Sequence, residues 1–147
     1  MTELLQDATQ LPEVARWHEV GHALAGTSRG ARFRGFRGRV PGVQSASTVM
    51  ELPDRWTLED QVVLLLGGYW GEVRSKGQMD AGAVLDALAQ EWASTTDPQA
   101  DARQLAALMA RGMRVRPLID RLDGACLLAL GAMVLDGSGL EGVLRAA

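Results

Sequence analysis

The spacing of apolar residues predicts a mainly helical chain. Within residues 12–25, Val14, Trp17 and Leu24 recur at helical spacing, so they would share one face of a helix. Pro12 suits the opening of this helix, because its missing N–H would have no partner there. Spacing and start signals of this kind predict five helices, over residues 12–25, 57–75, 83–93, 98–114 and 116–133.

The segment around residues 31–52 has a different character. Glycine and arginine alternate in its first part, and residues 45–50 (SASTVM) favour extended chain. Pro41 and Pro53 bound the extended part as turn signals. We therefore expect a mainly α fold with a small β-sheet or hairpin in this segment.

The composition restricts the class of protein. Its 147 residues, 47% hydrophobic and 22% charged, fit one globular domain over residues 1–147. The net charge of −3 gives no general attraction to nucleic acid. The longest apolar runs are shorter than the ~18 residues of a membrane span. Glu3 and Asp7 stand where a secretory signal would carry positive charge. We expect a cytoplasmic protein without a membrane span and without a nucleic-acid partner.

One segment of the first predicted helix carries the chemistry. Residues 18–22 read HEVGH and contain both histidines of the chain. Residues four apart lie on one face of a helix, so His18 and His22 can present ring nitrogens to one metal ion. Glu19 lies beside that face, where it can reach a metal-bound water as a general base. Zinc lowers the pKa of such a water toward ~7, so this pattern predicts a zinc metallopeptidase with one Zn²⁺ per chain.

The third protein ligand of this zinc ion is left open by the motif. A catalytic zinc ion usually has three protein ligands, and the chain offers no third histidine. Cys126 is the single cysteine, so a thiolate cluster and an internal disulfide are both excluded. The remaining candidates are the carboxylates of Glu72, Asp80, Asp86, Asp97 and Asp101.

Several segments resemble the zinc peptidase domain of the FtsH family of ATP-dependent metalloproteases. Residues 15–24 (ARWHEVGHAL) are similar to the zinc-binding helix of that family. Residues 65–68 (LLGG), followed by Glu72, are similar to its second signature helix. Residues 81–86 (AGAVLD) look like the motif whose final aspartate is the third zinc ligand, and residues 135–137 (LDG) resemble a turn near the end of the domain.

This resemblance implies a zincin-like helical bundle in which Asp86 is the third zinc ligand. Residues 95–101 also look like the aspartate motif, but they lie farther beyond the glycine pair. The resemblance therefore favours Asp86 over Asp101 and over Glu72. Glu72 would instead orient a ligand histidine by accepting a hydrogen bond from the ring nitrogen that does not bind the metal. The glycine pair, residues 67–68, would let the second helix approach the zinc helix closely.

The resemblance also implies a function and partners. The sequence holds neither the ATPase module nor the membrane helices of the FtsH family, so we expect a stand-alone peptidase domain. Its substrates would be unfolded or flexible polypeptides, a separate ATPase is a partner to consider, and a homo-oligomer is left open. The alternative is a binding or regulatory module that keeps the fold without proteolysis.

An extended substrate needs a strand edge that can hold its backbone. Ser45, Ala46, Ser47, Thr48 and Val49 are predicted to supply that edge, because small and β-branched residues suit it. They also stand where the FtsH-like domain has its active-site strand.

Overall fold

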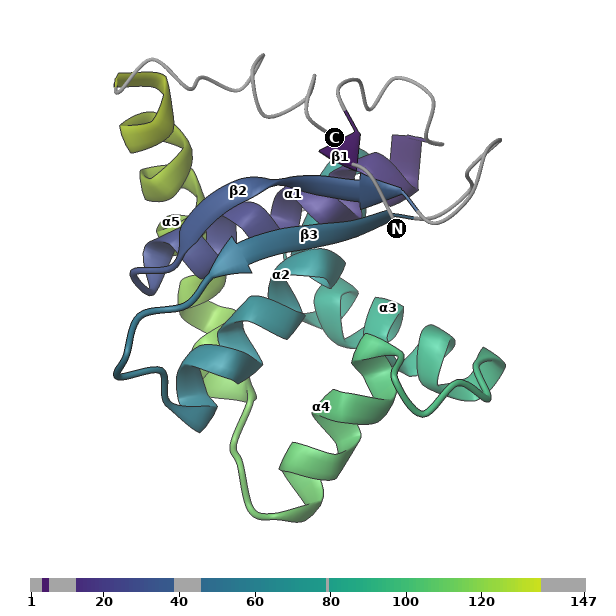
Figure 1. Ribbon diagram of the computed structural model, residues 1–147. Coiled ribbons are helices and arrows are strands. Elements are labelled where there is room, and N and C mark those ends of the chain that lie inside the picture. Colours follow the sequence, from purple (N-terminus) through teal and green to yellow (C-terminus); the bar gives the residue numbers. More distant parts are fainter. Residues whose placement is uncertain (1–3, 6–12, 39–45, 79, 136–147) are drawn as a thin grey trace.

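The computed structural model describes residues 4–5, 13–38, 46–78 and 80–135 (Figure 1). Its elements follow in the order β1 (Leu4–Leu5), α1 (Glu13–Ser28), β2 (Arg32–Gly38), β3 (Ala46–Glu51), α2 (Leu58–Ser75), α3 (Ala81–Ser94), α4 (Asp101–Ala110) and α5 (Arg116–Leu135). The mainly α fold with a small sheet is therefore confirmed. Each helix lies within a few residues of its predicted bounds, whereas the two-residue strand β1 has no counterpart in the prediction.

Local hydrogen bonds explain where α2 begins. Thr57 Oγ1 accepts a hydrogen bond from the backbone N–H of Asp60 at 3.0 Å, and the Asp60 carboxylate accepts one from the backbone N–H of Thr57 at 2.9 Å. This reciprocal capping box satisfies two N–H groups that the first turn of a helix leaves without a partner. The predicted start of this helix is therefore confirmed.

Helix α4 begins at Asp101, later than its predicted start at residue 98. A local turn precedes it, in which Asp97 Oδ1 accepts a hydrogen bond from the backbone N–H of Gln99 at 2.9 Å. The backbone N–H of Ala100 donates to the Asp97 carbonyl at 3.1 Å. The turn delays the helix, and it places Asp101 at the first position of α4.

The sheet is small, and β3 lies at its edge. Strand β2 pairs antiparallel with both neighbours, in the order β1-β2-β3, with a register shift between Phe33 and Gly35. The β2–β3 hairpin lies across α1 (Figure 1). The extended segment predicted over residues 45–50 is confirmed for residues 46–50 and continues to Glu51, whereas Ser45 lies outside the described residues.

Helices α1 and α2 cross with their backbones in contact. A Cβ atom added at Gly21 would overlap the carbonyl oxygen of Gly67, and one added at Gly71 would overlap the carbonyl oxygen of Trp17. A Cβ atom at Gly67 would overlap the Gly21 carbonyl in turn. The expected close approach of the two helices is therefore confirmed, and only glycine allows it.

The core lies around this crossing. Its largest fully buried side chains are Tyr69, Leu24, Leu66, Leu105, Leu122, Val20, Val62 and Cys126. Helix α5 packs against α1, α2 and α3. Among the described residues, no helix has the length and apolar character that crossing a membrane requires.

We predict that Gly21→Ala lowers the free energy of unfolding by at least about 1–3 kcal/mol, because the new methyl group would meet the Gly67 carbonyl. Gly124→Ala in α5 is the matched control, because a Cβ atom there has open space around it. That variant should be neutral or more stable by about 0.5–1 kcal/mol. Urea titrations measure both values, and equal effects would contradict the close crossing.

Candidate metal centre

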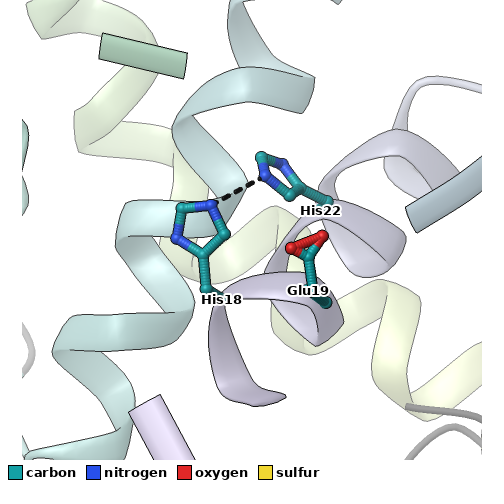
Figure 2. Close-up of side chains that lie close together, drawn as sticks. All are labelled: His18, Glu19 and His22. Atoms are coloured by element: carbon teal, nitrogen blue, oxygen red, sulfur yellow. Dashed lines mark hydrogen bonds between the residues drawn. The ribbon is translucent and has the colours of Figure 1, made fainter. Parts of the chain in front are cut away.

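His18 and His22 of α1 face one another (Figure 2). Their Nε2 atoms are 3.0 Å apart, and their ring centroids are 4.6 Å apart with an edge-to-face orientation. Together with Glu19 they form a cluster in which one potential ligand atom from each residue lies within 4.8 Å of the others. The helical spacing of the motif therefore produces the expected cluster of potential metal ligands.

Asp101 completes a triangle with the two histidines. Its Oδ2 atom lies 2.9 Å from His18 Nε2 and 2.8 Å from His22 Nε2. The aspartate reaches the site from the first turn of α4, whereas both histidines come from α1. Two nitrogen atoms and one carboxylate oxygen thus converge on one point from two helices.

The opposite ring nitrogen of each histidine is held from behind by α2. His18 Nδ1 lies 2.6 Å from Glu72 Oε2, and His22 Nδ1 lies 2.7 Å from the carbonyl oxygen of Leu64. A carbonyl oxygen only accepts, so His22 Nδ1 must carry a proton and donate it. In the neutral form of His22, the Nε2 lone pair then points toward Asp101. This is the arrangement by which metal-binding histidines are usually oriented.

The charges around the triangle favour a cation. Burial disfavours charge on His18, but its hydrogen bonds to Asp101 and Glu72 outweigh burial and raise its pKa to about 10. Burial opposes charge on His22 as well, and the hydrogen bond to Asp101 raises its pKa nonetheless. Burial disfavours the ionised form of Asp101, yet its two histidine partners hold its carboxyl pKa well below the usual range. The Asp101 and Glu72 carboxylates therefore favour positive charge at this point, carried by protons or by a metal ion.

The donor atoms of the triangle suit a small divalent ion, although the triangle is slightly tighter than such an ion requires. Zinc bonds to nitrogen and oxygen are about 2.0–2.2 Å long, so the ligand atoms of a tetrahedral site are roughly 3.3–3.6 Å apart. The three edges observed here measure 2.8–3.0 Å. A small outward movement of the three side chains would accommodate the ion. Nitrogen and carboxylate ligands without thiolate suit Zn²⁺, although the same donors bind other divalent metals.

Glu19 stands beside the triangle in a different environment. Only 7% of its surface is exposed, and its Oε1 atom accepts a hydrogen bond from Thr48 Oγ1 at 3.0 Å. The same hydroxyl lies 2.9 Å from the backbone carbonyl oxygen of Glu19. Strand β3 therefore contacts the motif directly through one side chain.

A cavity of about 420 Å³ adjoins these groups. Five parts of the chain line it: Glu19 and His22 of α1; Thr48 and Met50 of β3 with the following Leu52; Gln61, Leu64 and Leu65 of α2; Glu91 of α3; and Asp97, Gln99, Ala100 and Asp101 at the start of α4. The cavity brings the histidine face, the edge strand and the start of α4 together, so a bound molecule could contact all three.

Two further residues near the site, Tyr69 and Glu91, are not predicted by the sequence analysis. The fully buried ring of Tyr69 packs edge-to-face against His18, with centroids 5.5 Å apart. Glu91 projects from α3 into the cavity wall, where burial and the negative charge of Asp101 raise its pKa. No local motif marks either residue, because only the packing of α2 and α3 brings them to the histidines.

The structure places Asp101, and not Asp86, beside the histidine pair. Asp86 is exposed on α3 and lines another cavity, formed by α3 and α4. The resemblance favours Asp86 because the motif matches there without a gap in the sequence, whereas the position of an aspartate in space depends on the path of α3. After that helix and a loop the chain returns, so the more distant segment ending at Asp101 reaches the histidines. Glu72 contacts the Nδ1 atom of His18.

Gly68 makes room for the imidazoles. A Cβ atom added there would lie 2.5 Å from both Cε1 and Nε2 of His18, and 2.8 Å from Cε1 of His22. The second glycine of the pair, Gly68, therefore leaves space for the two imidazoles, whereas the first, Gly67, allows the close contact between α1 and α2.

Comparison with protein-family models, with curated proteins and with solved structures finds no match for this chain. The resemblance to the FtsH peptidase domain rests on the sequence motifs described above.

We predict that Gly68→Ala weakens the binding of a divalent metal ion at this candidate site by roughly 10–100-fold, a loss of the size seen when support of ligand histidines is removed. The new methyl group would displace both imidazoles. Isothermal titration with zinc measures the affinity, and Gly124→Ala serves as the control for a glycine replacement inside a helix. Unchanged zinc affinity in Gly68→Ala would contradict a metal site at the two Nε2 atoms.

Proposed function

We propose that this protein is a zinc-dependent metallopeptidase that hydrolyses peptide bonds in unfolded or flexible polypeptides. The observation that carries the proposal is the triangle of His18 Nε2, His22 Nε2 and Asp101 Oδ2 beside a buried Glu19 at a cavity. Three protein ligands with a fourth position left for water or substrate are typical of catalytic zinc sites.

His18, His22 and Asp101 are the proposed ligands, with one zinc ion per chain. Glu72 and the Leu64 carbonyl would fix the ring orientation of the two histidines, since each accepts a hydrogen bond from an Nδ1–H. The two imidazoles would bind zinc in their neutral forms, so metal binding would displace the protons that the site otherwise holds.

Glu19 is the proposed general base. When bound, a zinc ion would acidify a water molecule and polarise the scissile carbonyl group. The Glu19 carboxylate would take the proton of the attacking water and pass it to the leaving amine as the peptide bond breaks. Its position within 4.8 Å of the histidine ligand atoms, without being part of the triangle, supports this division of roles.

The edge position of β3 supports an extended substrate. No further strand pairs with β3 among the described residues, so its outer backbone groups can bind a polypeptide as an added strand. Of the proposed substrate strand, residues 45–49, Thr48 lines the cavity next to Glu19. Such binding requires an unpaired substrate backbone, so folded proteins would resist cleavage unless a separate ATPase unfolded them.

The site ligands have a direct test. Asp101→Asn should reduce zinc affinity by more than about 100-fold, since loss of a ligand exceeds the loss of a group behind one. Asp86→Asn is the matched control in α3 and should bind zinc like the original protein. Metal content after dialysis and zinc titration measure both. A large loss of zinc affinity in Asp86→Asn, with unchanged affinity in Asp101→Asn, would instead identify Asp86 as the third ligand.

The catalytic base has a separate test. Glu19→Gln should keep its zinc and lose at least about 100-fold of the cleavage rate, because an amide cannot take the proton of water. A casein-like unfolded polypeptide is the substrate, and a compact folded protein is the comparison. Zinc binding without any cleavage by the original protein would instead support a binding or regulatory module.

A further inference from the structure

Among the described residues, the hydroxyl group of Thr48 forms the side-chain hydrogen bond that joins the edge strand to Glu19. Thr48 Oγ1 lies 3.0 Å from Glu19 Oε1 and 2.9 Å from the Glu19 carbonyl oxygen. A hydroxyl has one proton and two acceptor positions, so it can donate to either oxygen. We propose that Thr48 is a positioning residue that holds Oε1 of Glu19 and leaves Oε2 to carry the proton during peptide hydrolysis.

This inference rests on the proposed function of Glu19, and it assigns different tasks to its two carboxylate oxygens. A hydrogen bond to a carboxylate is stronger than one between neutral groups. Held at Oε1, the carboxylate loses the freedom to rotate away from the attacking water. A base must lie within hydrogen-bond reach of the proton that it takes, so a fixed carboxylate gives a higher turnover rate.

The pleat of β3 explains why Thr48 supplies this contact. Side chains two residues apart on a strand point to the same face. Thr48 and Met50 both line the cavity, and Met50 also reaches Gly26 of α1. The face of β3 that carries Thr48 therefore lies against α1, so the hydroxyl meets Glu19 while the strand edge remains available to a substrate.

The same contact joins substrate binding to catalysis. A polypeptide that pairs with the edge of β3 would lie on the strand that also fixes Glu19. Movement of β3 toward or away from α1 would change the position of the base together with the position of the scissile bond. Thr48 thereby couples the position of the Glu19 carboxylate to the position of the bound polypeptide.

Three variants test the role of Thr48. Thr48→Val keeps the shape and removes the hydroxyl, whereas Thr48→Ser keeps the hydroxyl. Thr27→Val is the matched control, because Thr27 Oγ1 is buried in α1 without a hydrogen-bond partner among the described residues. Cleavage of an unfolded polypeptide gives kcat and KM, zinc titration gives metal affinity, and crystal structures of the zinc-loaded proteins locate the Glu19 carboxylate.

We expect Thr48→Val to lower kcat by about 10–100-fold, the range for removing a hydrogen-bonded supporting group. KM and zinc affinity should stay unchanged, and the Glu19 carboxylate should be displaced or occupy several positions. Thr48→Ser should restore kcat and the ordered carboxylate, and Thr27→Val should behave like the original protein. A Thr48→Val variant with unchanged kcat, or with Glu19 in its original position, would overturn the inference. If the original protein cleaves nothing, the proposed function fails, and the position of Glu19 in the crystal structures still decides the role of Thr48.

Discussion

The backbone contact between α1 and α2 is the constraint on which the rest of the structure depends. Gly21, Gly67 and Gly71 let the two helices touch without side chains between them. At this separation α2 can reach the far side of both imidazoles, through Glu72 on His18 and the Leu64 carbonyl on His22. A wider crossing would leave the Nδ1 atoms without these partners and the rings free to rotate. The helix crossing therefore determines the direction in which the two Nε2 atoms point.

The convergence of these atoms favours a positive charge at the meeting point of the helices. Two imidazole nitrogens and the Asp101 carboxylate meet within 3.0 Å of one another, although they belong to helices far apart in sequence. A metal ion at this point would join α1 to α4 directly and to α2 through the histidine partners. Such binding adds its free energy to that of folding when the unfolded chain has no preformed site. The site and the packing of the helices thus support one another.

The sequence predicts the parts of this structure that depend on local signals. Helical spacing and the Thr57–Asp60 capping box determine the helices, and the HEVGH motif predicts the cluster of potential metal ligands. The glycine pair predicts the close helix contact. The position of Asp101 depends instead on the path of α3 and of the loop after it. A short sequence motif does not predict that path. Thr48 appears in the sequence as a strand residue, but its bond to Glu19 follows from how the hairpin docks on α1.

In the proposed site, His18, His22 and Asp101 bind one zinc ion and leave a position for water or substrate. Zinc X-ray absorption spectroscopy of the loaded protein measures the ligand atoms directly. We expect a four-coordinate zinc ion with two imidazole ligands, oxygen ligands at about 2.0–2.2 Å and no sulfur at about 2.3 Å. A spectrum with fewer than two imidazole ligands, or with sulfur from Cys126, would contradict it.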